Sequence, residues 1–359
     1  MTTGERNRPN VARRRADQSP TAIGGVTMQT VAEIAGVSAM TVSRALKSDT
    51  PISQGTRQRV LAAVKRVGYV PDLNARVFAS RRSGFIAALV PSLNNSNFAD
   101  TVRGMSDVFD PAGLQMLLGD TEYSVSREES LLSAFLQRRP EAIILTGGVH
   151  TTRSRQLLRR AGIPTVETWE LPKKPLGHVV GFSNREAGAT IVQYLHSRGR
   201  KRIGFIGSGG KGDARGYERR LGYTRAIHEL GLPGGRVVLF GEPPASMSQG
   251  AEALDFMLGQ WPDTDAIVCV SDLSSFGVLA ECQRRGIAIP TRLALAGFGD
   301  FEVARCCHPR LTTISIDSRN IGRRAAEITL DALRERERGK TMVPGCTIVR
   351  FHVVERETA

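Results

Sequence analysis

Residues 30–46 read Thr30-Val-Ala-Glu-Ile-Ala-Gly-Val-Ser-Ala-Met-Thr-Val-Ser-Arg-Ala-Leu46, and this stretch decides how the N-terminal region folds. Its pattern is typical of a helix-turn-helix, with Ala32 or Ala35 where two helices cross, Gly36 in the turn and Val37 as an apolar plug. The second helix presents short or polar side chains: Ser38, Ala39, Met40, Thr41, Ser43 and Arg44. Such a helix can enter the roughly 12 Å major groove of DNA, where hydroxyls and arginine reach phosphates or bases.

The helical pattern continues and completes a three-helix unit. Apolar residues recur at i, i+1, i+4 and i+7 from Val60 to Val67, which predicts a third helix. We expect Ser53 to cap its N-terminus and Gly68 to end it. A plain pair of packed helices would show the same apolar positions. The basic third helix, with Arg57, Arg59, Lys65 and Arg66, favours DNA binding over that interpretation.

Charge is unevenly distributed along the chain. The 359 residues include 49 Lys and Arg against 35 Asp and Glu, a net charge of +14. Residues 1–82 hold 14 of the basic and 5 of the acidic residues, so a net of +9 falls on the first quarter of the chain. This asymmetry predicts a polyanionic partner for the N-terminal end. Residues 1–25 lack apolar periodicity and are expected to form a disordered basic arm.

The composition excludes several classes of protein. No apolar run approaches the ~18 residues of a membrane span, and no apolar segment follows the N-terminal arginines as in a secretion signal. Five cysteines are an odd number and thinly spread, which fits a reducing compartment, so we expect a cytoplasmic protein without a membrane partner.

The chain offers no recognisable catalytic or metal-binding motif. HExxH, GxSxG and zinc-ligand spacings do not occur, and the six histidines are scattered. Residues 207–212 match GxGxxG, but the expected helix does not follow at once and no acidic residue ends a second strand about 20 residues on. We therefore predict neither an enzyme nor a bound metal, nucleotide or other cofactor.

From residue 85 onward strand-like and helix-like segments alternate. The expected strands are 85–90, 115–118, 142–146, 165–168, 179–182, 202–206, 237–240, 266–270, 293–298 and 312–316. The expected helices are about 98–110, 126–138, 151–161, 184–198, 216–230, 247–259, 272–285 and 319–336. Strands that are apolar on both faces predict parallel sheets covered by helices, and ten strands predict two doubly wound α/β lobes. Ligands of such folds bind at the carboxyl ends of the strands, between the lobes.

The sequence resembles the LacI/GalR family of transcription regulators over nearly everything after residue 25. The resemblance is carried by residues 30–46, by Ile52-Ser53 with Thr56-Arg57, by Gly68-Tyr69-Val70-Pro71, and by Gly297-Phe298-Gly299-Asp300 with Leu311-Thr312-Thr313-Ile314. It implies a helix-turn-helix headpiece over 26–71, a hinge helix or linker over 72–83, and a periplasmic-binding-protein-like core over 84–359. The implied N-lobe is about 84–182 plus 317–344, and the C-lobe about 183–316 plus 345–359.

The resemblance also implies which residues touch DNA. Phosphate contacts are expected from Thr27, Ser38, Thr41, Ser43, Ser53 and Thr56, with Tyr69 nearby, and base contacts from Ala39, Met40 and Arg44. Residues 74–79, including Ala75, would form the hinge helix. Phe78 stands where the family usually has a leucine wedged into the minor groove. From the residues alone, without the resemblance to the family, Phe78 would be interpreted as a core residue.

Polar and aromatic residues at the strand ends suggest an effector site. The expected contacts are Asn97, Phe98, Thr146, Trp169, Phe182, Arg219, Ser271 and Asp272. One arginine with aromatic rings and polar groups suits a polyhydroxylated carboxylate. From the residues alone, Arg219 could equally form a surface salt bridge, and Trp169 could belong to the core. The core segments are most similar to those of gluconate-operon repressors, and Gly299 stands where relatives that bind neutral sugars have an aspartate.

These observations predict a homodimeric repressor that binds pseudo-palindromic operator DNA and is released by gluconate or a related sugar acid. Two recognition helices would occupy successive major grooves, and paired hinge helices the central minor groove. A dimer is expected rather than a tetramer, because no leucine heptads follow the last core segment. Three alternatives remain: the ligand is a corepressor, the chain is a solute-binding protein without a regulatory role, or it is an enzyme of sugar-acid metabolism.

Overall fold

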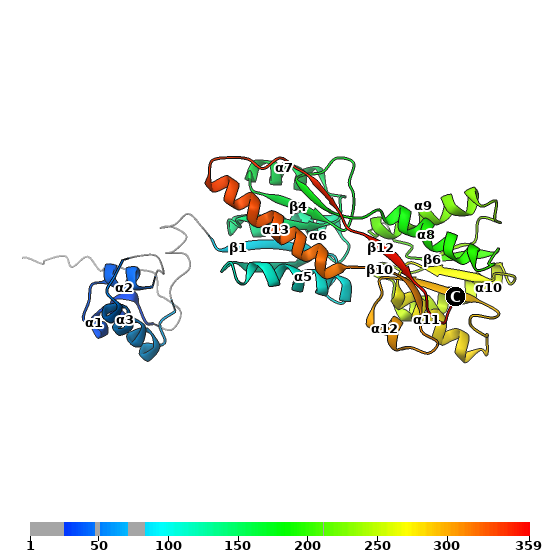
Figure 1. Cartoon of the computed structure of the whole chain (residues 1–359), viewed down its shortest axis with the longest axis horizontal. Helices are drawn as coiled ribbons and strands as arrows, with labels where there is room; N and C mark the ends of the chain where they lie inside the picture. The colour runs from blue at the N-terminus through cyan, green and yellow to red at the C-terminus, as the bar shows by residue number, and fades with distance from the viewer. Residues whose placement is uncertain (1–24, 47–50, 71–82, 211) are drawn as a thin grey trace, which may run out of the picture. The chain divides into compact units, whose positions relative to one another are not determined.

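The computed structural model describes residues 25–46, 51–70, 83–210 and 212–359 (Figure 1). The chain separates into two compact units, Met1–Ser83 and Gly84–Ala359, each with its own apolar core. Two predicted segments lie almost entirely outside the described residues: the arm over 1–25, except Gly25, and the hinge over 72–83, except Ser83. The predicted DNA contacts Ala75 and Phe78 therefore also lie outside them.

The first unit contains α1 (Met28–Ala35), α2 (Ala39–Ala45) and α3 (Gln54–Val67). Each helix begins at a hydroxyl residue, Thr27, Ser38 or Ser53, whose side chain accepts a hydrogen bond from the backbone N–H three residues later. Gly36 and Gly68 end α1 and α3 in the left-handed conformation, with φ of 63° and 64°. The predicted cap at Ser53 and both glycine ends are confirmed. The small core consists of Val31, Ala32, Ala35, Val42, Ala45, Val60, Ala63 and Tyr69.

The second unit is built on two six-stranded sheets. The N-lobe sheet has the order β11-β5-β4-β3-β1-β2 and is parallel throughout, with β1 (Phe85–Val90), β2 (Gln115–Asp120), β3 (Ala142–Thr146), β4 (Thr165–Thr168), β5 (His178–Gly181) and β11 (Cys346–Ile348). The C-lobe sheet has the order β12-β10-β9-β8-β6-β7, with β6 (Ile203–Gly207), β7 (Val237–Leu239), β8 (Ala266–Cys269), β9 (Ala294–Phe298), β10 (Thr312–Ile316) and β12 (Phe351–Val354). Only β12 runs antiparallel to its neighbour in the described strands.

Helices cover both sheets. The N-lobe carries α5 (Ser96–Phe109), α6 (Val125–Gln137), α7 (Thr152–Ala161) and α13 (Ser318–Glu337), and the C-lobe α8 (Asn184–Ser197), α9 (Ala214–Glu229), α10 (Met247–Gln260), α11 (Asp272–Arg284) and α12 (Glu302–Cys306). In Figure 1, α13 lies alongside α5, against which it packs. The ten predicted strands and eight predicted helices are found within two residues of their expected ends, so the predicted α/β fold class is confirmed. None of the described helices is long and apolar enough to cross a bilayer.

The chain passes between the lobes after β5, after β10 and after β11. Residues 346–348, which we expected in the C-lobe, pair with β5 of the N-lobe instead. The expected boundary at 344/345 therefore moves beyond Ile348, because three backbone pairs hold this short strand at the edge of the first sheet. The sequence pattern indicated neither β11 nor β12, nor the short α12.

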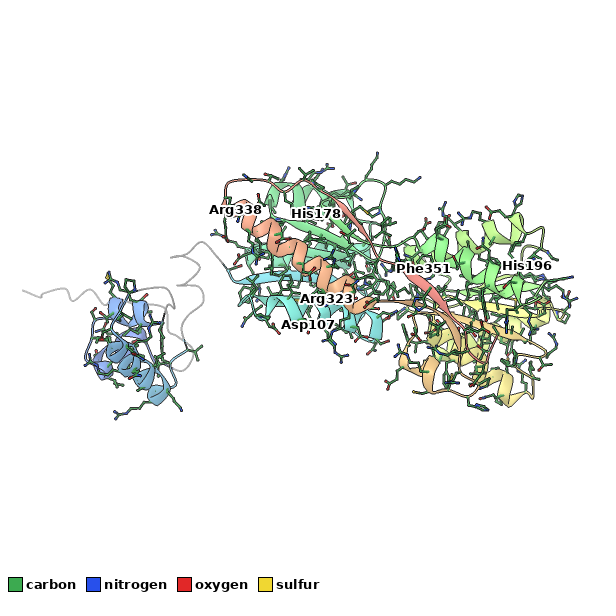
Figure 2. The ribbon with its side chains drawn as sticks, in the orientation of Figure 1. Asp107, His178, His196, Arg323, Arg338 and Phe351 are labelled. Carbon is green, nitrogen blue, oxygen red and sulfur yellow. The ribbon has the colours of Figure 1, made fainter. Side chains whose placement is uncertain are left out.

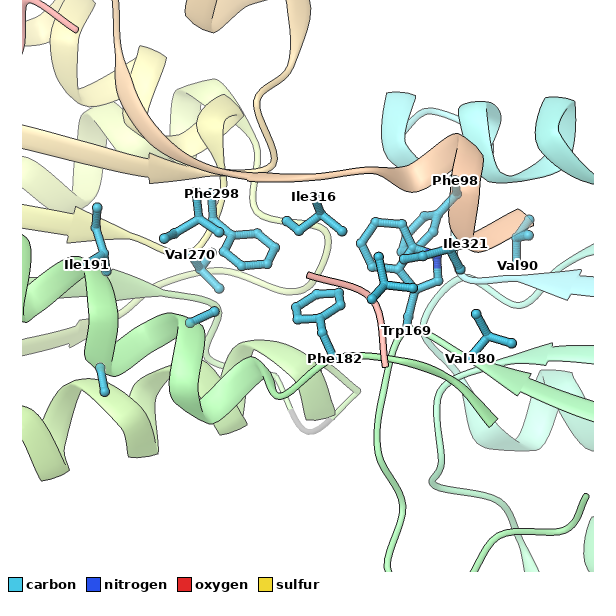
Figure 3. Packing of buried hydrophobic residues seen from close by; sticks show 14 of the residues in the cluster. Val90, Phe98, Trp169, Val180, Phe182, Ile191, Val270, Phe298, Ile316 and Ile321 are labelled. Atoms are coloured by element: carbon cyan, nitrogen blue, oxygen red, sulfur yellow. The ribbon is translucent and has the colours of Figure 1, made fainter. Parts of the chain in front are cut away.

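A row of aromatic side chains passes from one lobe to the other (Figure 3). The ring centroids of Phe98 and Trp169 are 5.3 Å apart, those of Trp169 and Phe182 5.8 Å, and those of Phe182 and Phe298 6.2 Å. All four rings are buried. Aromatic pairs at these separations attract one another beyond the gain from burial, so the lobes share one apolar core where the chain crosses between them.

Candidate functional site

The exposed face of α2 carries the residues predicted to touch DNA. Ser38, Met40 and Arg44 are exposed, while Ala39, Thr41 and Ser43 are half-buried. Met40 has 66% of its surface exposed. This face combines one cation, hydroxyls and an apolar tip, which is the mixture that reads base edges and phosphates.

The remaining predicted DNA contacts fall into two groups. Thr27, Ser53 and Thr56 lie at helix N-termini, where free backbone N–H groups and the helix dipole favour an anion such as phosphate. Thr27 and Ser53 are exposed, although their hydroxyls already accept a hydrogen bond as caps. Tyr69 is buried in the core of this unit with 7% of its surface exposed, so its ring supports the fold.

A cavity of about 90 Å³ lies between the lobes of the second unit. Five of the eight predicted effector contacts line it: Asn97, Phe98, Trp169, Arg219 and Ser271. The N-lobe residues among them come from α5 and from the end of β4, and the C-lobe residues come from α9 and from the start of α11. The cavity thus lies at the carboxyl ends of the strands, as the fold predicts.

Arg219 is the most unusual group in this cavity. Its Nη1 donates to Asn184 Oδ1 at 2.8 Å, and its guanidinium lies 4.0 Å from the centroid of the Phe298 ring. Its Nε is shielded from solvent and has no hydrogen-bond partner, and no carboxylate of the described residues forms an ion pair with it. Burial lowers the pKa of this guanidinium below its ordinary value. The charges of Asp213 and Glu170 act on this cation from a distance, but no carboxylate of the described residues makes a direct ion pair with it.

A second arginine, Arg215, joins the two lobes beside the cavity. Its Nη1 lies 3.4 Å from Glu170 Oε1, and its guanidinium lies 5.4 Å and 5.5 Å from the ring centroids of Phe98 and Tyr123. Arg215 belongs to α9 of the C-lobe, whereas all three partners belong to the N-lobe. Both ends of the ion pair are nearly buried, at 8% and 14% exposure. Arg215 therefore ties the lobes together where they enclose the cavity.

Three predicted effector contacts do not line the cavity. Phe182 packs between Trp169 and the rings of Phe298 and Phe351, so it is part of the core. Thr146 lies in a neighbouring, more open hollow at the mouth of the cleft. Asp272 is fully buried and its carboxylate is already occupied. The end of a strand lies beside the cleft, but the conformation of the following turn decides which side chain lines the cavity.

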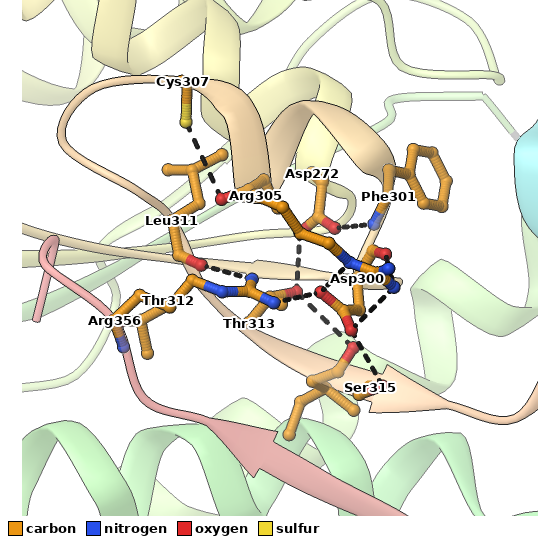
Figure 4. A network of polar contacts seen from close by, with 12 residues as sticks. Asp272, Asp300, Phe301, Arg305, Cys307, Leu311, Thr312, Thr313, Ser315 and Arg356 are labelled. Atoms are coloured by element: carbon orange, nitrogen blue, oxygen red, sulfur yellow. Dashed lines mark hydrogen bonds and ion pairs between the residues drawn. The ribbon is translucent and has the colours of Figure 1, made fainter.

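The Asp272 carboxylate organises the loop that forms one wall of the cavity (Figure 4). It accepts hydrogen bonds from the Thr313 hydroxyl at 2.6 Å and from the Phe301 backbone N–H at 2.7 Å. Burial raises its pKa to about 6, and these two donors act against that increase. The neighbouring Asp300 accepts from Ser315 and forms ion pairs with Arg305 and Arg356. Phe301 lines the cavity, so Asp272 acts on the site by positioning it.

Another charged cluster is buried in the N-lobe. His150 lies in the loop after β3. Its Nδ1 is 2.8 Å from Glu128 Oε1, and its Nε2 is 3.3 Å from Glu167 Oε1. The three side chains are 0%, 8% and 1% exposed. Burial alone lowers the pKa of His150, but the hydrogen bonds and charges of both glutamates outweigh it and raise the pKa to about 9. The imidazolium thus holds the loop after β3 to α6 and β4.

Sequence reasoning missed several residues that line the cavity: Ser92, Tyr123, Asp213, Arg215, Phe298 and Phe301. Tyr123 follows β2 and Phe298 ends β9, so the strand-end rule could have found both. Arg215 lies four residues before Arg219, one helical turn away on the same helix, and this spacing was the available signal. Its ion pair with Glu170 spans 45 residues of sequence and left no local pattern.

Comparison with known proteins gives consistent matches. Residues 27–72 match the family described as bacterial regulatory proteins, lacI family, and residues 192–359 match the periplasmic binding protein-like domain. The HTH-type transcriptional regulator GntR of Pseudomonas aeruginosa is 34% identical over 342 residues, which cover 95% of this chain and 98% of that protein.

Solved structures match over similar lengths. A crystal structure of a LacI-family transcriptional regulator from Silicibacter pomeroyi has a TM-score of 0.85 and 33% identity, covering 93% of this chain and 99% of that one. The lac repressor dimer bound to operator and an anti-inducer shares the fold, with a TM-score of 0.80 at 22% identity, over 93% of this chain and 98% of that one.

Proposed function

Because the chain belongs to the LacI family of bacterial regulatory proteins, we propose that it is a cytoplasmic, homodimeric repressor whose operator binding is released by gluconate or a closely related sugar acid. It is a regulator of that family and not an enzyme. The observation that carries the choice of ligand is Arg219, a cation in the inter-lobe cavity that lacks a carboxylate partner among the described residues.

A sugar acid complements this cavity in charge. Its carboxylate would give Arg219 the direct anionic partner that it lacks, in a charge-assisted hydrogen bond that can use the free Nε–H. A neutral sugar would leave the guanidinium unbalanced. Arg215 is a poorer partner for the carboxylate, because Glu170 already neutralises it.

The remaining lining suits a polyhydroxylated chain. Asn97, Ser271 and Asp213 offer polar groups, while Phe98 and Trp169 offer apolar surfaces for C–H groups. Gly299 keeps a second acid, in addition to Asp213, out of the cavity wall: a Cβ at this position would meet the Phe301 ring and the Asn97 amide, which belong to that wall. An aspartate there would repel a carboxylate, so the glycine agrees with a sugar-acid ligand.

The same contacts would couple ligand binding to DNA binding. A ligand held by Arg219 on one side and by Asn97 on the other would draw the lobes together, and Arg215 with Glu170 would hold them closed. In a dimer, closure would change the spacing that residues 72–83 require between the two DNA-binding units. A short hinge helix is marginal by itself, so differential contacts worth a few kcal/mol would be enough to release it from DNA.

The proposal is tested by measuring binding to double-stranded promoter fragments from the organism's own genome by fluorescence anisotropy, with and without gluconate. D-glucitol is the matched control, because it differs from gluconate chiefly in lacking the carboxylate. We expect gluconate, but not glucitol, to weaken DNA binding. If gluconate tightens DNA binding, the ligand is a corepressor. If no promoter fragment binds at low salt, the repressor proposal is wrong.

The role of Arg219 is tested separately with Arg219→Ala, using Arg220→Ala as the matched control. Arg220 is the next residue on α9, and its guanidinium stacks on Tyr217 and does not line the cavity. We expect R219A to weaken gluconate binding by about 2–5 kcal/mol, as for loss of one partner of a buried charge pair, and to keep operator binding. Titration calorimetry measures the first and anisotropy the second. A gluconate response in R219A would place the carboxylate elsewhere.

A further inference from the structure

A second cavity, of about 430 Å³, opens in the N-lobe at the opposite ends of the strands. It is lined by the end of α7, the first residues of β4 and β5, the end of α13 and the segment 340–344. Because the inter-lobe cavity lies at the carboxyl ends of the strands and this one at their amino ends, the two sites share no lining residue. Its volume is within the range of small-molecule sites.

The floor of this cavity is apolar. Leu158, Val166 and Ala332 contribute buried side chains, and Leu176 and Met342 contribute half-buried ones. A ligand that covered this floor would gain roughly 25 cal/mol for each Å² of apolar surface removed from water. A purely ionic ligand would not use this surface, so the floor favours a molecule with an apolar body.

The rim of the cavity is basic. Arg159 of α7, Arg336 of α13 and Lys340 line it, and none of the lining residues is acidic. Within the described residues these three cations form no ion pair. By contrast, the hollow at the mouth of the inter-lobe cleft is lined by Glu122, Glu128, Glu170 and Glu242. The cations of the N-lobe cavity are therefore free to attract an anion, whereas three of these four glutamates are paired with Arg127, His150 and Arg215.

His178 adds a hydrogen-bond donor to the same wall. Its Nδ1 accepts from the Gly345 backbone N–H at 3.0 Å, so in the neutral imidazole the proton is on Nε2. Burial lowers the pKa of His178, which favours this neutral form. Its Nε2 is buried and has no hydrogen-bond partner in the part of the chain that the structure describes. Figure 2 labels His178 and, near the end of α13, Arg338 on this side of the N-lobe.

We infer that this cavity binds a small organic phosphate, with the phosphoryl oxygens held by Arg159, Arg336 and Lys340 and an apolar body placed on the floor. The segment 340–344 leads directly into β11, and from β11 the chain crosses to β12 of the C-lobe. A ligand here therefore contacts the segment that leads into the strand before this crossing. It provides a second input to the regulator, independent of the effector that enters between the lobes.

The test uses the full chain and phenyl phosphate, which joins a dianion to an apolar ring. Titration calorimetry compares it with phenol, which lacks the charge, and with inorganic phosphate, which lacks the ring. We expect phenyl phosphate to bind with one equivalent per chain and both fragments to bind at least about tenfold more weakly, because phenol lacks the charge for the basic rim and inorganic phosphate lacks the ring for the apolar floor. No binding of phenyl phosphate at millimolar concentration overturns the inference.

Variants locate the binding. The double variant R159A/R336A removes two rim cations, and R153A/R334A is its matched control, since Arg153 and Arg334 lie on the same helices but pair with Glu129 and Asp331. We expect R159A/R336A to weaken phenyl phosphate binding by about tenfold or more, and the control by less than about twofold. Equal losses in both variants indicate diffuse surface charge and overturn the inference.

Two further measurements distinguish this cavity from other places where phenyl phosphate could bind and from a role in DNA binding. R219A should keep phenyl phosphate binding, so its loss in that variant would place the ligand in the inter-lobe cavity. A labelled duplex without an operator tests whether these cations serve the DNA backbone instead. Weaker duplex binding by R159A/R336A, together with no phenyl phosphate binding by the intact chain, assigns the surface to DNA and contradicts a small-molecule site.

Discussion

His150 in the N-lobe and Arg219 in the C-lobe are both cationic side chains withdrawn from water, but their surroundings differ. His150 touches two carboxylates, which together raise its pKa to about 9. Arg219 touches an amide oxygen and a ring, and burial lowers its pKa. A balanced buried charge holds the fold together, whereas an unbalanced one marks a place where a ligand can complete the balance.

Replacing His150 by Gln gives the largest expected effect. The change removes the cation between Glu128 and Glu167 and leaves two buried carboxylates without a counter-charge, although Glu167 still accepts from the Leu176 backbone N–H. The core should therefore lose about 3–5 kcal/mol of unfolding free energy. Urea unfolding followed by tryptophan fluorescence measures this, since Trp169 is buried in the core and Trp261 packs against the C-lobe core. His308→Gln is the control, because that histidine is 95% exposed and should matter little. A loss below 1 kcal/mol in H150Q would contradict the balanced-cluster interpretation.

The same cluster predicts how stability depends on pH. The pKa of His150 is about 9 in the folded chain and 6.5 by default, so its contribution is fully present below pH 6.5 and is lost as pH rises through 9. The difference in unfolding free energy between the unmodified protein and H150Q should therefore shrink by roughly 3 kcal/mol from pH 6.5 to pH 10. Urea unfolding at both pH values checks this. A constant difference would show that the imidazole is neutral in the fold.

An exposed cation extends the comparison to the DNA-binding unit. Arg44 on α2 remains in water, so Arg44→Ala should leave stability unchanged and weaken operator binding by about 1–3 kcal/mol. Fluorescence anisotropy with a promoter fragment measures the binding, and thermal unfolding of the same sample checks the stability. Unchanged affinity would remove Arg44 from the interface with DNA.

Replacing Arg219 by Met is expected to change stability much less than replacing His150. Methionine keeps the length of the side chain and removes a charge that has no carboxylate partner, so the relief of desolvation should offset the lost hydrogen bond to Asn184. We expect the unfolding free energy to stay within about 1 kcal/mol, while gluconate binding is lost. A larger loss of stability would mean that Arg219 supports the fold, and the contrast with His150 would fail.

The helix-turn-helix unit was predictable because its signals are local. Helix caps at Thr27, Ser38 and Ser53 and the glycine ends at Gly36 and Gly68 act within four residues of chain. The ten core strands were predictable for a similar reason, because a strand that is apolar on both faces marks a buried parallel sheet. The short β11 and β12 were not, since β11 is exposed at the edge of its sheet and only pairing with a distant segment makes it a strand.

The inter-lobe cavity was predictable only in part. The rule that ligands meet strand ends located Asn97, Phe98, Trp169 and Ser271, but it could not show that Phe182 turns into the core or that Asp272 is engaged by Thr313 and Phe301. Those outcomes depend on contacts over tens of residues of chain.

The sequence by itself determined the order of the ten predicted strands and the longer helices, the basic N-terminal unit and the exposed polar face of α2, because hydrophobic periodicity, helix caps and net charge are properties of neighbouring residues. The tertiary structure alone decided which charges are balanced. Arg215 meets Glu170, His150 meets two glutamates and Arg219 meets no carboxylate of the described residues. Charge balance depends on distances of a few ångströms between residues far apart in the chain, and only the folding of the sheets fixes those distances.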